Sequence, residues 1–233
     1  MTEFITAMLA MAAGVFAGSA AAKLRSRAAY RGFAAGLRDT RLMPGRLLIL
    51  GAATLAAAES ACAATLAGAL ILRLAWPAEG AGLALAALAV AVALTAVLAA
   101  GVGTALRRGT IAHCACFGAG AGRPLGAAHL VRNLCLLALL ATALAGLALT
   151  PGGPAPAGPA LTGPALTGPA LAAAAGLVIA VLFIRWDDLA YLLAPLPVNR
   201  QLLRADPAAS IPPPFPQGRS HARGWPSHGH TTP

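Results

Sequence analysis

Two cysteines separated by a single residue carry the most specific chemistry in this sequence. They lie in the segment His113-Cys114-Ala115-Cys116-Phe117-Gly118. Residues two apart place their Cα atoms about 5.5–7 Å apart, near the upper limit for a disulfide, so a Cys114–Cys116 bond would be strained. Strained disulfides are more oxidising and exchange readily. Flanking positive charge favours the reactive thiolate, and it is supplied by Arg107, Arg108 and Arg123. The spacing therefore predicts thiol–disulfide exchange, without a cofactor.

The same segment permits a second interpretation, as a metal site. Two thiolates and two imidazoles could bind zinc or copper, and they would come from His113, Cys114, Cys116 and His129. The spacing matches no standard structural zinc pattern, so Cu(I) would be the better candidate. A third interpretation is a short loop with no chemistry. These alternatives stay open at the level of the sequence.

A carboxylate within an apolar run is the second unusual feature. Glu59 lies near the middle of the run Leu47–Leu72, where a charge costs about 2.5–3.5 kcal/mol to insert into a membrane. Such a residue normally has a partner inside a helical bundle, and Lys23 and Arg132 are the candidates. Cys62 follows Glu59 by three residues and shares its helix face. The pairing could equally be a structural polar clamp without catalytic function.

A comparable pattern follows later in the chain, where His129, Arg132 and Cys135 recur at every third residue. We expect these three to share a helix face and to gather acid, base and thiol in one interior. Cys62 and Cys135 are then candidate relay thiols, supported by Glu59 and the basic residues. The alternative is that each cysteine is simply a small buried apolar residue.

The composition defines the elements that must position these residues. The chain of 233 residues is 58% hydrophobic and 10% charged, and its mean hydropathy is +0.75. About twenty apolar residues cross a bilayer. Five runs approach that length: Phe4–Ala22, Leu47–Leu72, Ala81–Leu106, Asn133–Leu149 (beginning near His129 if longer) and Pro169–Ile184. We predict an all-α polytopic transmembrane helical bundle of four core spans plus a fifth.

The predicted spans divide the chain into four parts. Residues 1–149 form a four-span membrane domain, 150–168 a Pro/Gly-rich linker, 169–194 the fifth helix and 195–233 a disordered tail. The first run ends in small residues that resemble a signal-peptide cleavage site. We interpret it as a span, because it has Glu3 but no preceding Lys or Arg.

The net charge of +10 is concentrated between the first two spans. That segment has Asp39 as its one acidic residue and seven basic ones: Lys23, Arg25, Arg27, Arg31, Arg38, Arg41 and Arg46. Basic loops stay in the cytoplasm. We therefore expect the segment 23–46, the Cys114 loop and the tail in the cytoplasm, and the N-terminus outside. Segment 23–46 could also lie on the membrane surface as an amphipathic stretch. No nucleic-acid-binding module is recognisable.

Four elements of the sequence together resemble one family. They are Ala17-Gly18-Ser19-Ala20-Ala21-Ala22-Lys23-Leu24 at the end of the first span, Glu59, Cys114-Ala115-Cys116-Phe117-Gly118, and Arg132-Asn133 at the start of the fourth. The pattern resembles the MauE-type methylamine utilisation membrane proteins, grouped with DoxX-like membrane proteins, over roughly residues 1–149. The resemblance implies a multi-pass protein for processing, transport or maturation of the disulfide-rich small subunit of methylamine dehydrogenase, beside a thioredoxin-like partner.

The sequence thus predicts a multi-pass protein of the cell (plasma or inner) membrane that acts as a thiol–disulfide relay, with thiol–disulfide oxidoreductase activity left open. Its expected partners are a thioredoxin-like protein, an exported disulfide-containing client and membrane lipid. A copper-handling protein and a non-catalytic scaffold for the thioredoxin-like partner are the alternatives. One conflict remains: an exported client calls for thiols on the outer face, whereas the charge pattern places Cys114 and Cys116 inside.

Overall fold

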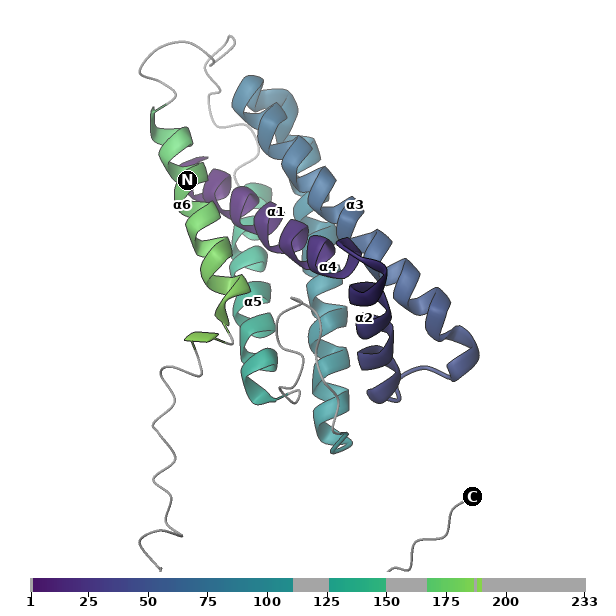
Figure 1. Ribbon diagram of the computed structural model, residues 1–233. Helices are drawn as coiled ribbons and strands as arrows, with labels where there is room; N and C mark the ends of the chain where they lie inside the picture. Colours follow the sequence, from purple (N-terminus) through teal and green to yellow (C-terminus); the bar gives the residue numbers. More distant parts are fainter. Residues whose placement is uncertain (1, 111–125, 150–166, 187, 190–233) are drawn as a thin grey trace, which may run out of the picture. The chain divides into compact units, whose positions relative to one another are not determined.

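Long apolar helices make up nearly all of the described chain. The computed structural model describes residues 2–110, 126–149, 167–186 and 188–189. The elements are α1 (Thr2–Leu24), α2 (Arg27–Asp39), the 3-10 helix η1 (Gly45–Leu47), α3 (Leu48–Ala75), α4 (Pro77–Arg107), α5 (Ala127–Leu149) and α6 (Thr167–Ile184). Figure 1 shows their arrangement.

Five of these elements are long and apolar enough to cross a membrane: α1, η1 with α3, α4, α5 and α6. Alanine and leucine dominate them, and both have high helix propensity. Pro77 stands at the start of α4, where a missing N–H costs nothing. The all-α polytopic bundle is therefore confirmed. α5 begins at Ala127, before the run predicted from Asn133.

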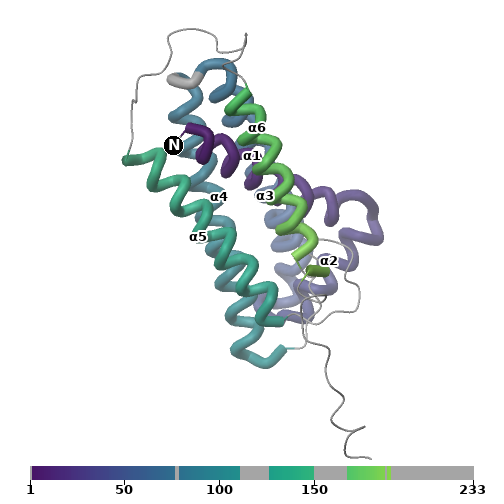
Figure 2. Tube along the Cα trace, turned by 90° about the vertical axis from the view of Figure 1, so that its left-hand side faces the viewer, coloured from purple at the N-terminus to yellow at the C-terminus, as the bar shows by residue number. Residues whose placement is uncertain are grey.

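The first helix lies at the centre of the packing. α1 contacts α3, α5 and α6, and the two views in Figures 1 and 2 show these helices around it. In its most apolar 18-residue window 61% of the residues are buried, against at most 33% in the other four spans. α1 is therefore the most buried of the five spans.

Small residues let α6 approach α1 closely. A Cβ atom at Gly14 of α1 would lie 2.8 Å from Ala180 Cβ of α6, and one at Gly176 of α6 would collide with the Ala7 carbonyl. Close approach of backbones over small residues is a common way for helices to pack in membranes, where hydrophobic burial gives little discrimination. The glycines thus fix the contact between these two helices.

A short amphipathic helix follows α1. Ser26 caps α2 by accepting a hydrogen bond from the Ala29 N–H at 3.1 Å. Phe33 is the buried side chain of this helix, whereas Arg27, Arg31 and Arg38 are exposed. The amphipathic stretch expected between the first two spans is therefore a helix that packs its apolar face on α1 and α3.

Candidate functional site

A buried ion pair joins the last turn of α1 to the middle of α3. The Lys23 ammonium forms an ion pair with the Glu59 carboxylate, and the two side chains are 0% and 1% exposed. The sequence left Lys23 and Arg132 as candidate partners for Glu59, and in the structure Lys23 occupies that place. Removing two charges from water costs several kcal/mol each unless their geometry and hydrogen bonds compensate.

Two further groups compensate the buried charges. Ser19 lies one turn before Lys23 on the same face of α1; its hydroxyl donates to Glu59 Oε2 at 3.0 Å and accepts from Lys23 Nζ at 2.6 Å. The Phe33 ring of α2 lies 5.0 Å from the ammonium, within the range of a cation–π interaction. Ser19 was not among the predicted site residues. Its spacing of four residues from Lys23 is the signal that could have identified it.

A cavity of about 50 Å³ adjoins this ion pair. Its polar wall consists of Ser19, Glu59, Thr95, Arg132 and Asn133, and the remainder is Val15, Phe16, Leu98, Val102 and Leu136. About 10–15 Å³ holds one water molecule when polar partners are present, so several fit here. Four helices therefore line a mainly apolar cavity, with Glu59 and Arg132 among its few polar residues.

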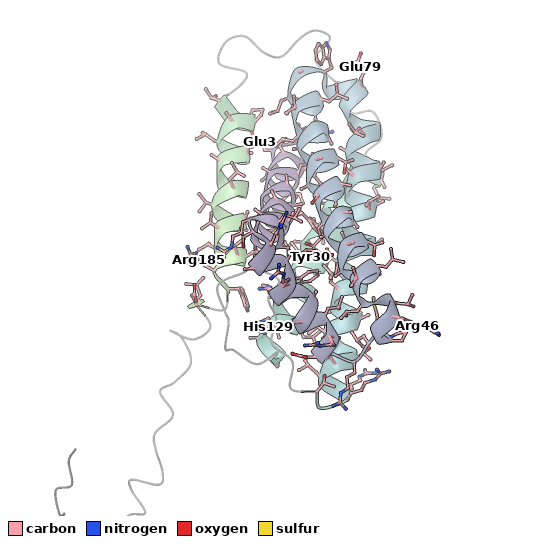
Figure 3. All side chains as sticks on the ribbon, turned by 45° about the vertical axis from the view of Figure 1, so that its right-hand side comes forward. Glu3, Tyr30, Arg46, Glu79, His129 and Arg185 are labelled. Atoms are coloured by element: carbon pink, nitrogen blue, oxygen red, sulfur yellow. The ribbon has the colours of Figure 1, made fainter. Side chains whose placement is uncertain are left out.

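Arg132 and His129 both lie buried in the first turns of α5, with 3% and 7% exposure. His129 Nδ1 accepts a hydrogen bond from the Gly126 N–H at 3.3 Å. In a neutral imidazole the other nitrogen, Nε2, then carries the proton. His129 therefore helps to fix the start of α5, and Arg132 extends the polar wall of the cavity. Figure 3 shows His129 at this end of the bundle.

The two described cysteines lie in contrasting places. Cys62 is 1% exposed and belongs to the apolar core, three residues after Glu59. Cys135 is exposed on α5. The expectation that Cys135 shares a face with His129 and Arg132 is wrong. Each step of three residues falls about 60° short of a full turn, so two steps carry Cys135 about 120° away from His129.

The predicted exchanging pair lies outside the described residues. Cys114 and Cys116, with His113, belong to the segment 111–125 that connects α4 to α5. Within the ranges that the structure describes, no three His, Cys, Asp or Glu side chains gather as a metal site would require. Of the proposed metal ligands only His129 is described, so the metal alternative stays a hypothesis.

The family follows from a comparison with protein-family models. The sequence matches the model described as "Methylamine utilisation protein MauE" over residues 1–149. This chain belongs to the MauE family. The match covers α1 to α5 and includes Lys23, Glu59, Arg132 and both cysteines of the Cys-x-Cys segment; α6 lies beyond it. Comparisons with curated proteins and with solved structures give no match.

The family and the helices together define what kind of protein this is. It is a MauE-type multi-pass membrane protein of methylamine utilisation, with an additional apolar helix after the matched region. The resemblance seen in the Cys-x-Cys-Phe-Gly segment is confirmed. All the polar residues that the structure gathers at the cavity lie within the matched part of the chain.

Proposed function

We propose that this protein is a thiol–disulfide relay of the plasma (inner) membrane that assists maturation of an exported, disulfide-containing protein. By family the client is the small subunit of methylamine dehydrogenase. The observation that carries the proposal is the cavity lined by both Glu59 and Arg132. It is built by the two helices, α4 and α5, that the Cys114–Cys116 segment connects, together with α1 and α3.

The proposed reaction transfers two electrons from client to relay. A client thiolate attacks the Cys114–Cys116 disulfide and forms a mixed disulfide between client and relay. The second client thiolate then attacks the client sulfur of this mixed disulfide, and the relay cysteine leaves as a thiolate. The client disulfide forms and the Cys114–Cys116 bond breaks, leaving a dithiol. A disulfide in a thioredoxin-like partner reoxidises that dithiol by the reverse exchange and is itself reduced. Each thiol must lose its proton to react, and the cavity offers a carboxylate and space for water to receive it.

The remaining predicted site residues take different places in this reaction. Cys62 is the better candidate for a relay thiol inside the bundle, because it is buried beside Glu59, whereas Cys135 faces outward. Lys23 and Arg132 are polar support: Lys23 pairs with Glu59, and the positive charges of both residues favour anionic groups at the cavity. Cys135 is therefore the natural control position for the exchanging pair.

The test is the redox state of the client in cells that carry cysteine variants. We expect Cys114→Ser and Cys116→Ser to abolish client oxidation while membrane insertion stays normal, and Cys135→Ser to behave like the wild type. Alkylation-shift gels should show Cys114 and Cys116 in both dithiol and disulfide forms. Free thiols only, with and without the partner, would contradict the relay. Copper bound stoichiometrically and lost in both variants would favour the metal alternative, and normal client oxidation would favour the scaffold.

A further inference from the structure

The turn between α2 and η1 has a backbone that its sequence does not favour. Arg41, just after the end of α2, has φ 53°, in the left-handed region that favours glycine. Packing holds the turn instead. Leu42 lies 3.7 Å from where a Cβ at Gly101 of α4 would be, and the Met43 sulfur lies against Gly51 of α3. The turn is therefore clamped between two spans.

The clamped turn brings together arginines from distant parts of the sequence. Arg108, which caps α4, donates from Nη1 to the Arg41 carbonyl at 3.3 Å across 67 positions of sequence. We define the arginine patch as four exposed residues: Arg41, Arg46, Arg107 and Arg108. Arg38 pairs with Asp39 and Arg185 with Asp188, and within the described chain no ion pair joins a patch arginine to a carboxylate. Figure 3 shows Arg46 and Glu79 at opposite ends of the bundle.

Apolar side chains continue directly from the patch. Leu47, Ile49 and Leu50 follow Arg46 and are 47%, 75% and 62% exposed. A phospholipid has a matching order of groups, because its charged phosphate is followed by two apolar acyl chains. Guanidinium groups bind phosphate oxygens in a bidentate manner, and basic residues beside a span attract anionic headgroups. An acidic soluble ligand would match the arginines but leave these three side chains without a counterpart.

We propose that the arginine patch binds the headgroup of an anionic phospholipid, whose acyl chains lie along Leu47, Ile49 and Leu50. The patch shares no residue with the lining of the cavity, although Arg107 and Arg108 also flank the segment that carries Cys114 and Cys116. The guanidinium of Arg41 is placed by the strained turn, and that of Arg108 by its hydrogen bond to the same turn. Binding at this point would tie α2 and the ends of α3 and α4 to one lipid.

The experiment titrates the purified full chain in detergent with phosphatidylglycerol or phosphatidylcholine and measures bound lipid by native mass spectrometry. Arg41→Gly is the informative variant, because glycine adopts the observed φ freely and the turn persists. Arg108→Gln removes the second guanidinium. Arg185→Gln, directly after the end of α6, makes the same charge change at another exposed arginine and is the matched control.

We expect the wild type to prefer phosphatidylglycerol. Each patch variant should weaken its affinity about fivefold, as expected for one basic residue near an anionic surface, and Arg185→Gln should leave it unchanged. An equal loss in Arg185→Gln would show general charge attraction and overturn the proposal, as would equal binding of the two lipids. Loss of polyglutamate binding in the patch variants, with lipid binding unchanged, would assign the patch to an acidic protein segment and overturn the lipid site.

Discussion

Lys23 and Glu59 form an ion pair between α1 and α3 in which neither side chain is exposed by more than 1%. The pair is buried in the bundle beside the cavity, and Ser19 and the Phe33 ring are among its neighbours. Its partners therefore depend on each other: either charge alone would be buried without compensation, which is far more costly than burying both or neither.

Removing the charge of one member of the pair should consequently lower the stability of the protein more than removing both charges. We expect Glu59→Leu or Lys23→Met to lower the free energy of unfolding by about 3–5 kcal/mol, and the double variant to recover most of it. Membrane insertion should persist in all three. Unfolding in detergent measures the energies. Glu79→Leu, at the exposed first turn of α4, is the control and should cost under about 1 kcal/mol. Additive single effects would show that the two residues are not coupled.

The contact between α1 and α6 should be sensitive to a single methyl group. A Cβ at Gly176 would meet the Ala7 carbonyl and lie 3.0 Å from Ala10 Cβ, so Gly176→Ala should destabilise the protein by about 1–3 kcal/mol. Gly68→Ala is the matched control, because its Cβ would meet nothing within 4 Å. Thermal unfolding of the purified variants compares them. A midpoint for Gly176→Ala equal to that of Gly68→Ala would show that α6 does not pack as described.

The two described cysteines should differ in reactivity. In a variant that lacks Cys114 and Cys116, a small thiol reagent should modify Cys135 in the folded protein in detergent and leave Cys62 intact, because Cys62 is 1% exposed and Cys135 is exposed. Mass spectrometry after digestion reads out both sites. Denaturation should then make Cys62 equally reactive. Modification of Cys62 at the rate of Cys135 without denaturant would disagree with its burial.

The side of the membrane that carries the exchanging pair can be tested directly. The basic residues between α1 and α3 predict that Cys114 and Cys116 react in intact cells with a permeant maleimide but not with an impermeant one. Labelling by the impermeant reagent would reverse this topology and place the thiols beside an exported client. Reaction with neither reagent, followed by reaction after reduction, would identify a pair that is already oxidised.

The sequence predicted the helices well because insertion into a membrane depends on the length and apolarity of a run, and both can be read directly. It also predicted that Glu59 would be paired, because an isolated intramembrane charge is costly. The choice of Lys23 over Arg132 depends on how α1 packs on α3, which hydropathy does not encode. Ser19 was missed because its hydroxyl becomes a site group only through its hydrogen bonds to Lys23 and Glu59, and these depend on the same packing. Cys135 was misplaced because a three-residue repeat drifts around the helix.

The close fit between α1 and α6 bears on how the protein is made. Synthesis proceeds from the N-terminus, so α1 enters the membrane long before the helix that covers one of its faces through Gly14 and Gly176 exists. In the interval α3 is the first long helix that α1 can hold, through Lys23 and Glu59. The Lys23–Glu59 ion pair can then form early in synthesis and hold α1 in register against α3. The glycine contact between α1 and α6 forms later.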